Sequence, residues 1–442
     1  MGKYFGTDGI RGRANEGVLA PEMVLRVGRA LARTLPEDTV LVGRDTRASG
    51  PMMEQALAAG ILAEGKKVGF LGVLPTPAVA RAVQDTEGAC GVMLTASHNP
   101  FYDNGIKIFA ADGFKISDAE EAALEAFLDN PAEPSGAETA TGETFVKSDG
   151  AERYVASLAK ARANLDLSGV SLVVDAGNGA AFEVATTIFS QFGAKVTLLN
   201  ASPDGKNINE GCGALHPERA AAKVKELGAD LGICLDGDAD RVIFIDDTGE
   251  VVSGDRVLYL AACALKSKGE LTHDTLVATV MSNLGLGKAL REKGIALETT
   301  GVGDRLVLER MRAGGFNLGG ENSGHVIFSD LATTGDGLGC ALAILAMMQE
   351  AGASLRELGA GLTEFPQVLE AVAVAKKPPL EEVPELRAAM AEVEERLGDD
   401  GRILVRYSGT EPKLRILVEA ADRAMAEKEA GFLVTQALKH LT

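Results

Sequence analysis

The chain lacks the features that mark membrane and secreted proteins. In its 442 residues, no uninterrupted apolar run approaches the ~18 residues that a transmembrane helix needs. The N-terminus has no apolar signal core, so we expect a cytoplasmic protein. The five cysteines are scattered and lack the spacing of a zinc site, which indicates buried free thiols in a reducing compartment.

Positive charge is also in short supply. The chain has 44 lysines and arginines against 63 acidic residues, which gives a formal net charge of −19. Such an excess of negative charge disfavours nucleic acid and anionic membranes as partners. We therefore expect a small-molecule ligand and allow for a homodimer. A site for a phosphorylated ligand would have to be locally basic against this overall field.

Two common catalytic motifs are absent as well. The chain has no Walker-type Gly-x-x-x-x-Gly-Lys-Ser/Thr loop, which argues against a kinase of the P-loop type. No Gly-x-Ser-x-Gly elbow surrounds Ser97, which argues against a serine hydrolase built on that turn.

The pattern of elements predicts several domains, since a chain of this length is too long for one core and favours ~3 domains or more. Strand-like and helical stretches alternate as far as residue 366, which indicates three similar α/β domains with mixed sheets. A smaller C-terminal α+β domain follows. We expect domains at residues 1–150, 151–252, 253–366 and 367–442, with an exposed, breaker-rich connection at residues 130–142.

The individual elements follow from the same periodicity. Predicted strands are residues 39–42, 67–70, 92–94, 106–109, 171–175, 195–199, 232–235, 242–245, 276–280, 326–328, 368–374, 402–406 and 414–419. Predicted helices are residues 22–33, 52–64, 256–265, 339–349, 381–397 and 424–441.

Ser97 stands out among the residues that are present. It lies in the run Thr-Ala-Ser-His-Asn-Pro (residues 95–100), directly after the apolar residues 92–94. Ligands of parallel α/β sheets bind beyond the carboxyl ends of strands. An exposed, rigidly held hydroxyl there, close to a cation, is suited to carry a phosphoryl group. A Ser–Asn–Pro turn without chemistry is the alternative.

Asp236, Asp238 and Asp240 alternate at the end of another apolar run. At the period of a strand, their carboxylates would project to one side and need a cation. Ligands that are all oxygen suit Mg²⁺ or Mn²⁺. An EF-hand loop begins with the same alternation but would need Gly in place of Arg241 and Glu in place of Asp247. A solvated acidic turn remains as the plain alternative.

A glycine-containing loop at residues 319–325 reads Gly-Gly-Glu-Asn-Ser-Gly-His. Glu321, Asn322 and Ser323 offer hydrogen-bonding groups to hydroxyls or an amine, and glycines let the backbone approach a ligand. His325 is a candidate proton shuttle because of its intrinsic pKa range. A polar loop without a ligand fits equally well.

Residues 406–412 (Arg-Tyr-Ser-Gly-Thr-Glu-Pro) suit a phosphate. The Ser-Gly-Thr turn presents backbone N–H groups and two hydroxyls, and Arg406 and Arg415 supply charge. A plain hairpin between two strands is the alternative. We interpret Asp45, which has arginines on both sides at residues 44 and 47, as part of a structural ion pair.

With these four loops in this order, the chain resembles the α-D-phosphohexomutase superfamily, and within it the bacterial phosphoglucosamine mutases. The resemblance covers essentially the whole chain. The superfamily markers are residues 95–100 followed by 103–107, then 236–241, 320–325 and 408–412. The subfamily markers are residues 5–12, 207–209 with Cys212, Gly213 and His216, 279–283, and 301–305. Asn322 and Tyr407 depart from the Gln and Pro that are common there.

The resemblance implies four domains around one central cleft. It implies an isomerase that interconverts glucosamine 6-phosphate and glucosamine 1-phosphate for the amino-sugar and cell-wall precursor pathway. The reaction would run through a phosphoserine enzyme, one Mg²⁺ per active site and a bisphosphorylated sugar. The alternatives are a phosphomannomutase or phosphoglucomutase on the same scaffold, a metal-dependent phosphatase, a kinase, and a non-catalytic sensor of sugar phosphates.

The resemblance also implies a role for each motif residue. Ser97 would carry the phosphoryl group and, with Asp236, Asp238 and Asp240, hold the metal. Arg11, Lys107, His98 and His325 are the other candidate catalytic residues. Glu321, Asn322 and Ser323 would bind the sugar. The non-reacting phosphate would contact Arg406, Ser408, Gly409, Thr410 and Arg415.

Overall fold

The computed structural model describes residues 2–130, 141–408 and 412–441. They form two compact units. Unit 1 is Met1–Met281 with Leu297–Gly359, and unit 2 is Ser282–Ala296 with Ala360–Thr442. The helix α9 (Leu284–Glu292) therefore groups with the C-terminal part of the chain. Most of the predicted connection at residues 130–142 lies outside the described residues.

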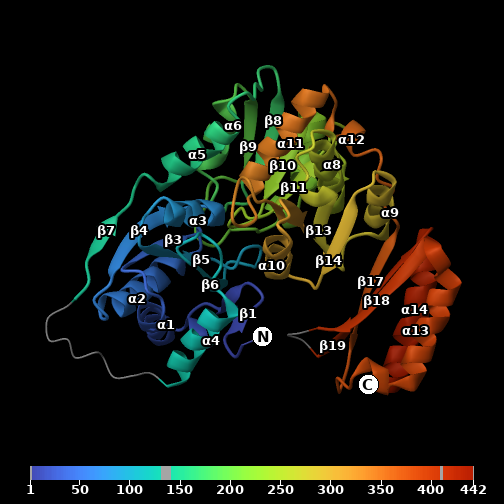
Figure 1. The fold of residues 1–442 in the computed structure, drawn as a ribbon, viewed down its shortest axis with the longest axis horizontal. Coiled ribbons are helices and arrows are strands. Elements are labelled where there is room, and N and C mark those ends of the chain that lie inside the picture. The colour runs from blue at the N-terminus through green and yellow to red at the C-terminus, as the bar shows by residue number, and fades with distance from the viewer. Residues whose placement is uncertain (1, 131–140, 409–411, 442) are drawn as a thin grey trace. The chain divides into compact units, whose positions relative to one another are not determined.

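The first sheet of unit 1 is mixed (Figure 1). Its order is β1 (Phe5–Gly6), β2 (Gly9–Arg13), β6 (Asp103–Phe109), β5 (Ala89–Leu94), β3 (Thr39–Arg44), β4 (Lys67–Val73), β7 (Thr144–Val146). Strands β4, β3 and β5 are parallel, whereas β6 runs antiparallel to β5. Because β3 and β5 are parallel neighbours, the loops that follow them leave the same edge of the sheet.

Two further mixed sheets complete unit 1. One has the order β12 (Val251–Val252), β11 (Val242–Ile245), β10 (Leu231–Leu235), β8 (Ser171–Asp175), β9 (Lys195–Leu199). The other has the order β14 (Ala296–Thr300), β13 (Thr275–Thr279), β15 (Leu318–Gly320), β16 (Val326–Phe328). In both, a parallel pair adjoins an antiparallel hairpin, which is β10–β11 in one sheet and β15–β16 in the other. The two hairpins carry the predicted metal and sugar loops.

The helices of unit 1 connect and cover these strands. They are α1 (Pro21–Thr34), α2 (Gly50–Leu62), α3 (Thr76–Gln84), α4 (Asp118–Asp129), α5 (Gly150–Ala161), α6 (Val184–Ser190), α7 (Glu218–Leu227), α8 (Gly254–Ser267), α10 (Asp304–Gly314), α11 (Gly337–Ala351) and α12 (Leu355–Leu358). Helix α11 is apolar on almost every face and is buried accordingly. Within the described ranges, no helix is long and apolar enough to cross a membrane.

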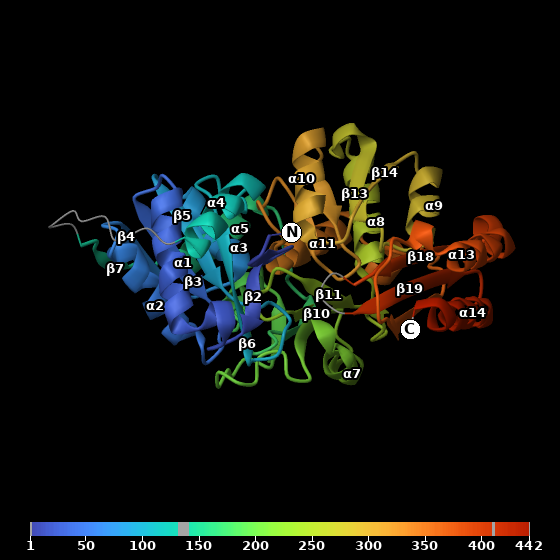
Figure 2. The same ribbon diagram turned by 90° about the horizontal axis from the view of Figure 1, so that it is seen from below.

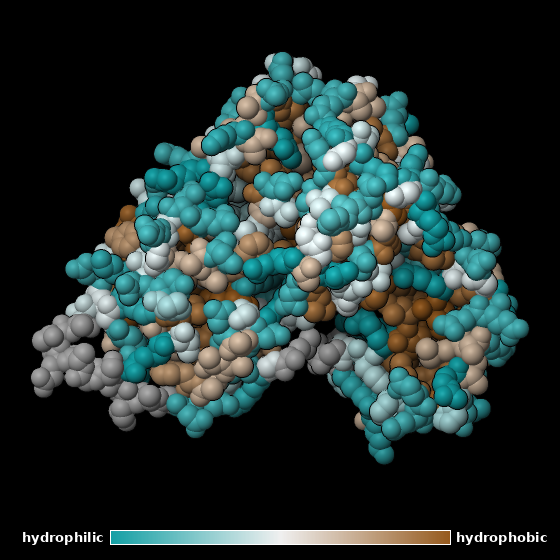
Figure 3. Space-filling view, viewed as in Figure 1, coloured by the Kyte–Doolittle hydropathy of each residue, from teal (hydrophilic) through white to brown (hydrophobic). Residues whose placement is uncertain are grey.

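Unit 2 contains an antiparallel sheet in the order β17 (Gln367–Ala373), β19 (Lys413–Ala420), β18 (Gly401–Tyr407). Helices α13 (Pro384–Leu397) and α14 (Arg423–Leu441) lie along one face of it (Figures 1 and 2). Hydrophobic side chains gather over the strands on the side shown in Figure 3, and Leu369 of β17 is 54% exposed.

The predicted fold class, with mixed-sheet α/β domains and a smaller C-terminal unit, is confirmed. Four predicted strands, at residues 171–175, 195–199, 242–245 and 326–328, have the bounds of β8, β9, β11 and β16. The helix predicted from residue 381 begins later, at Pro384, because proline fixes the backbone of a first helical turn and residues 380–382 form a separate 3₁₀ turn. Helices α3, α4, α5, α6, α7, α9, α10 and α12 were not predicted.

Candidate active site

Ser97 follows β5 in a loop with an unusual backbone. Its φ is +51°, in the left-handed region that residues other than glycine rarely adopt. The hydroxyl Oγ donates to Asp236 Oδ2 at 2.6 Å, and Ser97 is only 1% exposed. The expectation of an exposed hydroxyl is therefore wrong for this structure, because the acidic loop covers it. Serine and acid, 139 residues apart in sequence, are in direct contact.

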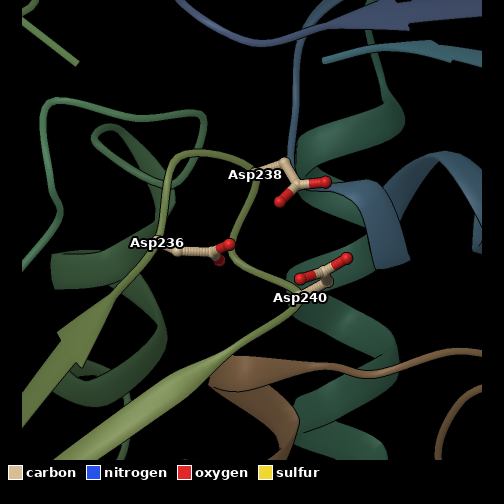
Figure 4. A group of neighbouring side chains, drawn as sticks. All are labelled: Asp236, Asp238 and Asp240. Carbon is tan, nitrogen blue, oxygen red and sulfur yellow. The ribbon is translucent and has the colours of Figure 1, made fainter. Parts of the chain in front are cut away.

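The three aspartates lie in the turn of the β10–β11 hairpin (Figure 4). Oxygen atoms of Asp236, Asp238 and Asp240 all lie within 4.8 Å of one another. The prediction that they converge is confirmed, but its reason was wrong. They are not in a strand, and the left-handed Ala239 at φ +57° turns the chain so that the carboxyl groups surround one space. The flanking strands also exclude an EF-hand, which needs helices.

Two carboxylate oxygens in this turn are suited to a metal ion. Asp238 Oδ2 accepts hydrogen bonds from Thr76 Oγ1 at 2.5 Å and Lys107 Nζ at 2.8 Å, and Asp240 Oδ2 accepts one from Lys107 Nζ at 2.7 Å. The other oxygens, Asp238 Oδ1 and Asp240 Oδ1, are buried without a hydrogen bond from any described residue. Buried oxygens of this kind require a partner. The donor set, all oxygen, fits a hard divalent cation.

The pKa values of the acids diverge within this turn. Burial and the neighbouring carboxylates of Asp240 and Asp238 raise the pKa of Asp236 to about 8. Burial would also raise the pKa of Asp240, but Lys107 and His325 outweigh it and hold that pKa well below its usual range. Without a cation the turn is therefore short of positive charge on the side of Asp236, which faces Ser97.

The cationic residues of the site form a connected network. Lys107 is 1% exposed and also lies 3.2 Å from Asp8, which in turn pairs with Arg11. Burial would lower the pKa of Lys107, but Asp238, Asp240 and Asp8 hold it well above the usual value, so Lys107 stays charged. Lys115 continues the network by bridging Asp8 and Asp304.

The two imidazoles of the site have different surroundings. His98 Nδ1 lies 3.4 Å from Ser97 Oγ. Burial, with the charges of Arg241 and Arg11, lowers the pKa of His98 to about 4, so this ring is neutral near pH 7. The backbone N–H of Gly335 donates to His325 Nε2 at 3.2 Å, so the neutral ring carries its proton on Nδ1, which lies 3.6 Å from Asp240.

The predicted sugar loop lies between β15 and β16. Glu321 is buried, and its Oε1 accepts a hydrogen bond from the N–H of Gly303 at 3.1 Å. Ser323 Oγ is buried and has no hydrogen-bond partner among the described residues. Asn322 is partly buried, and its carbonyl accepts from the N–H of Gly254 at 3.3 Å. A hydroxyl and two polar side chains therefore remain for a ligand.

The predicted phosphate loop belongs to unit 2. Arg406 and Arg415 lie directly opposite each other on β18 and β19. Burial, with the charge of Arg415, lowers the pKa of Arg406. The carbonyl of Ser408 accepts from Lys377 Nζ at 2.6 Å, a lysine that sequence reasoning did not select. Gly409 and Thr410 lie outside the described residues.

Sequence reasoning missed several residues that contact the site. Asp8 and Asp304 lie in motifs quoted for the family resemblance, but nothing in their spacing links them to Lys115. The predicted structural ion pair of Asp45 is confirmed, since Arg47 Nε donates to it at 2.8 Å. No sequence signal showed that Arg47 also reaches the carbonyls of the Ser97 loop, at 2.8 to 3.0 Å for the bonds to Ser97, Asn99 and Asp103.

Comparison with known proteins explains this collection of loops. Models of the phosphoglucomutase/phosphomannomutase α/β/α domains I, II and III match residues 2–135, 152–249 and 253–365. The model of the C-terminal domain matches residues 369–436. The chain belongs to the phosphoglucomutase/phosphomannomutase family. The order of the family's domains is the order in which the serine, acidic, sugar and phosphate loops follow one another here.

Individual members of this α-D-phosphohexomutase family match over nearly the full length. The phosphoglucosamine mutase of Nocardia farcinica is 49% identical, with 98% of each chain covered. A phosphoglucomutase/phosphomannomutase family protein from Burkholderia thailandensis has a similar structure, with a TM-score of 0.82, 28% identity, and 99% and 97% of the two chains covered.

A second solved structure shares the fold at lower identity. It is the Aspergillus fumigatus N-acetylphosphoglucosamine mutase in complex with GlcNAc-6P and magnesium. Its TM-score is 0.69 at 20% identity, with 99% and 96% of the two chains covered.

Proposed function

We propose that the chain is a phosphoglucosamine mutase, an isomerase that interconverts glucosamine 6-phosphate and glucosamine 1-phosphate. The observation that carries this proposal is the contact of Ser97 Oγ with Asp236 inside a buried turn of three carboxylates. The relatives that match nearly the full chain at 45–50% identity bear the same name.

Ser97 acts as the phosphoryl carrier in this proposal. In the first half-reaction the bond between Ser97 Oγ and phosphorus breaks, and a bond from phosphorus to a sugar hydroxyl oxygen forms. The proton of that hydroxyl ends on Ser97 Oγ, and neutral His98, 3.4 Å away, is placed to relay it. The bisphosphorylated sugar then turns, and the same exchange runs in reverse at its other phosphate.

Phosphoryl transfer depends on positioning and on neutralising charge. Asp236, Asp238 and Asp240, with the phosphate on Ser97, would hold one Mg²⁺, which supplies charge neutralisation at the transferred group. Lys107 remains charged and adds to this from its buried position. Arg11 pairs with Asp8, the carboxylate that also lies near Lys107. His325 Nε2 accepts from the N–H of Gly335, and its Nδ1 lies 3.6 Å from Asp240.

Recognition of the sugar phosphate falls to two other loops. Glu321, Asn322 and Ser323 bind hydroxyls and the amine. The hydroxyl of Ser323, buried without a hydrogen-bond partner in the described part of the chain, supports this role. The non-reacting phosphate binds Arg406, Ser408, Gly409, Thr410 and Arg415. The proposal divides the chain into four functional domains, at residues 1–150, 151–252, 253–366 and 367–442. Each domain contributes one of the four loops.

The direct test is turnover of three substrates by the purified protein. Glucosamine 6-phosphate, glucose 6-phosphate and mannose 6-phosphate are compared by kcat/KM, with a trace of the matching sugar bisphosphate and Mg²⁺ present. We expect glucosamine phosphate to be preferred. Faster turnover of glucose or mannose phosphate would assign the chain to the other mutases of the family. Release of inorganic phosphate without isomerisation would indicate a phosphatase, and binding without either reaction a sensor.

Intact-mass analysis tests the carrier separately. A mass increase of one phosphoryl group that phosphatase removes, and that peptide mapping places on Ser97, is the expected result. A phosphoryl group on another residue, or none after incubation with the sugar bisphosphate, would contradict the role of Ser97.

A further inference from the structure

The carbonyl oxygens around Ser97 are held from two sides by buried side chains that no motif marks as catalytic. One is Arg47, which follows β3, and the other is Asn209, from the loop after β9. Both donate to the same two carbonyls, those of Ser97 and Asn99. We call Arg47 and Asn209 the carbonyl clamp.

Arg47 is fully buried, and the acceptors around it match its five N–H groups. Nε donates to Asp45, Nη2 donates to the carbonyls of Ser97 and Asn99, and Nη1 donates to two further carbonyls, those of Pro100 and Asp103. A buried guanidinium is costly unless its donors are satisfied, so this environment is specific for arginine. Lysine has three donors on one nitrogen and cannot reach five acceptors.

Asp45 also fixes the backbone N–H of Ser97, through Thr95. Its Oδ2 also accepts from Thr95 Oγ1 at 2.7 Å, and Thr95 Oγ1 in turn accepts from the N–H of Ser97 at 2.9 Å. Both the N–H and the carbonyl of Ser97 are therefore fixed by a chain of bonds that returns to the Asp45–Arg47 pair.

Asn209 approaches the same carbonyl from the second sheet of unit 1. Its Nδ2 donates to the Ser97 carbonyl at 2.9 Å and to the Asn99 carbonyl at 3.2 Å. Gly237 of the acidic turn completes the enclosure, because a Cβ on it would lie 2.5 Å from the Ser97 carbonyl oxygen. The acidic turn therefore lies against both the hydroxyl and the backbone carbonyl of Ser97, and Asn209 binds the carbonyl.

These contacts hold Ser97 in a conformation that it would not adopt alone. A serine at φ +51° relaxes toward negative φ unless the surroundings prevent it, and relaxation would swing Oγ away from Asp236. Phosphoryl transfer is sensitive to such displacement, since reacting atoms must stay aligned through two half-reactions.

We propose that Arg47 and Asn209 are positioning residues for the phosphoryl transfers of Ser97, holding its carbonyl so that Oγ stays aimed at the acidic turn. The inference rests on the proposed function. It assigns a role to Asn209 of the Asn207–Asn209 marker. Because the clamp acts on phosphoryl transfer and not on binding, loss of either residue should lower kcat and leave KM for the sugar phosphate nearly unchanged.

Asn209→Gly is the decisive variant, because glycine accepts the φ of +59° and only the amide is lost. Asn178→Gly is its matched control. Asn178 has φ +49° in the turn after β8. Among the described residues, its side chain bonds to Ser202, Asn207 and Cys212 and not to the serine loop. Arg47→Lys keeps the positive charge but loses the planar guanidinium with its five N–H donors. We expect it to have the larger effect.

The readout is the single-turnover rate at which enzyme phosphorylated on Ser97 transfers its phosphoryl group to a saturating hexose phosphate. We expect a fall of about tenfold for Asn209→Gly and about a hundredfold for Arg47→Lys, with KM within about twofold of wild type. Asn178→Gly should transfer at the wild-type rate. If Arg47→Lys does not fold, Asn209→Gly decides alone.

The outcomes separate the two proposals. A wild-type protein that transfers no phosphoryl group from Ser97 overturns the proposed function. A wild-type protein that transfers it, with Asn209→Gly equal to wild type or no slower than Asn178→Gly, overturns the carbonyl clamp alone. So does a variant in which KM rises as much as kcat falls, which would show a loss of binding.

Discussion

The acidic turn of unit 1 gathers negative charges, whereas the arginine pair of unit 2 gathers positive charges. In the turn, three carboxylates gather around one space, and two of their oxygens are buried without a hydrogen-bond donor among the described residues. In unit 2, two guanidinium groups lie opposite each other on adjacent strands. Like charges so close are unfavourable by themselves. In the proposed function, each cluster binds a ligand of the opposite charge, a cation in one case and an anion in the other.

The two regions differ in how deeply their charges are buried. Lys107 neutralises part of the acidic turn and is itself buried, so that region is largely assembled before any ligand arrives. Arg406 and Arg415 are only partly buried. A buried, preorganised centre suits the chemical step, and a partly solvated pair suits reversible capture of a phosphate. Four variants or conditions test this division.

Removing the carrier should have the largest effect. Ser97→Ala leaves both charged clusters intact but removes the only hydroxyl that contacts Asp236 among the described residues, so turnover should fall at least about ten-thousandfold. Binding of the sugar phosphate, measured by calorimetry, should remain within about threefold of wild type. Turnover near that of wild type would show that the acidic turn serves another nucleophile.

Removing the cation should come next. Dialysis against EDTA should lower turnover about a thousandfold, and Mg²⁺ should restore it, because the acidic turn then lacks its compensating charge. Sugar phosphate binding through the arginine pair should change much less. Asp238→Asn is the matched variant and should raise the Mg²⁺ concentration needed for half-maximal rate. Full activity in EDTA would end the assignment of the turn to a metal.

Stability of the metal-free protein should depend on pH through Asp236. Its pKa is raised to about 8 in the folded protein, against about 4 in an unfolded chain. The folded state keeps a proton that the unfolded state has lost, so stability falls as pH rises through this window.

In EDTA, Asp236→Asn should therefore gain on the order of 2 kcal/mol over wild type between pH 5 and about 8. Urea unfolding at several pH values measures this difference. Parallel pH profiles for the two proteins would show that the carboxylate is already ionised without a cation.

The smallest effect is expected in unit 2. Arg406→Leu should raise KM for the sugar phosphate about tenfold while leaving kcat within about threefold. It should also stabilise the protein by about 0.5 kcal/mol, since one of two opposed charges is gone. Arg423→Ala, an exposed arginine paired with Glu427 on α14, is the control and should change neither. A loss of kcat in place of KM would move Arg406 into the chemical step.

Much of this architecture could be predicted from the sequence. Strands such as residues 171–175 and 242–245 were predicted with their observed bounds, because apolar runs of this short length between breakers favour a strand. Helices such as α3, with prolines at residues 75 and 77, and α4, with only Leu124 and Leu128 buried, were missed. Packing against neighbours decides such segments, and neighbours are not visible in one dimension.

For the candidate active site, the sequence by itself was enough to predict which groups would carry the chemistry. Ser97, the three alternating aspartates and the Glu321–Ser323 loop are short motifs whose residue types imply their roles. Only the tertiary structure decided that Ala239 turns the acids toward one another, that Lys107 lies between two of them, and that Arg47 and Asn209 meet at the Ser97 carbonyl. The contacts of Lys107, Arg47 and Asn209 join residues from 50 to more than 130 positions apart. They depend on which strands become neighbours, a property of the packed chain and not of any local pattern.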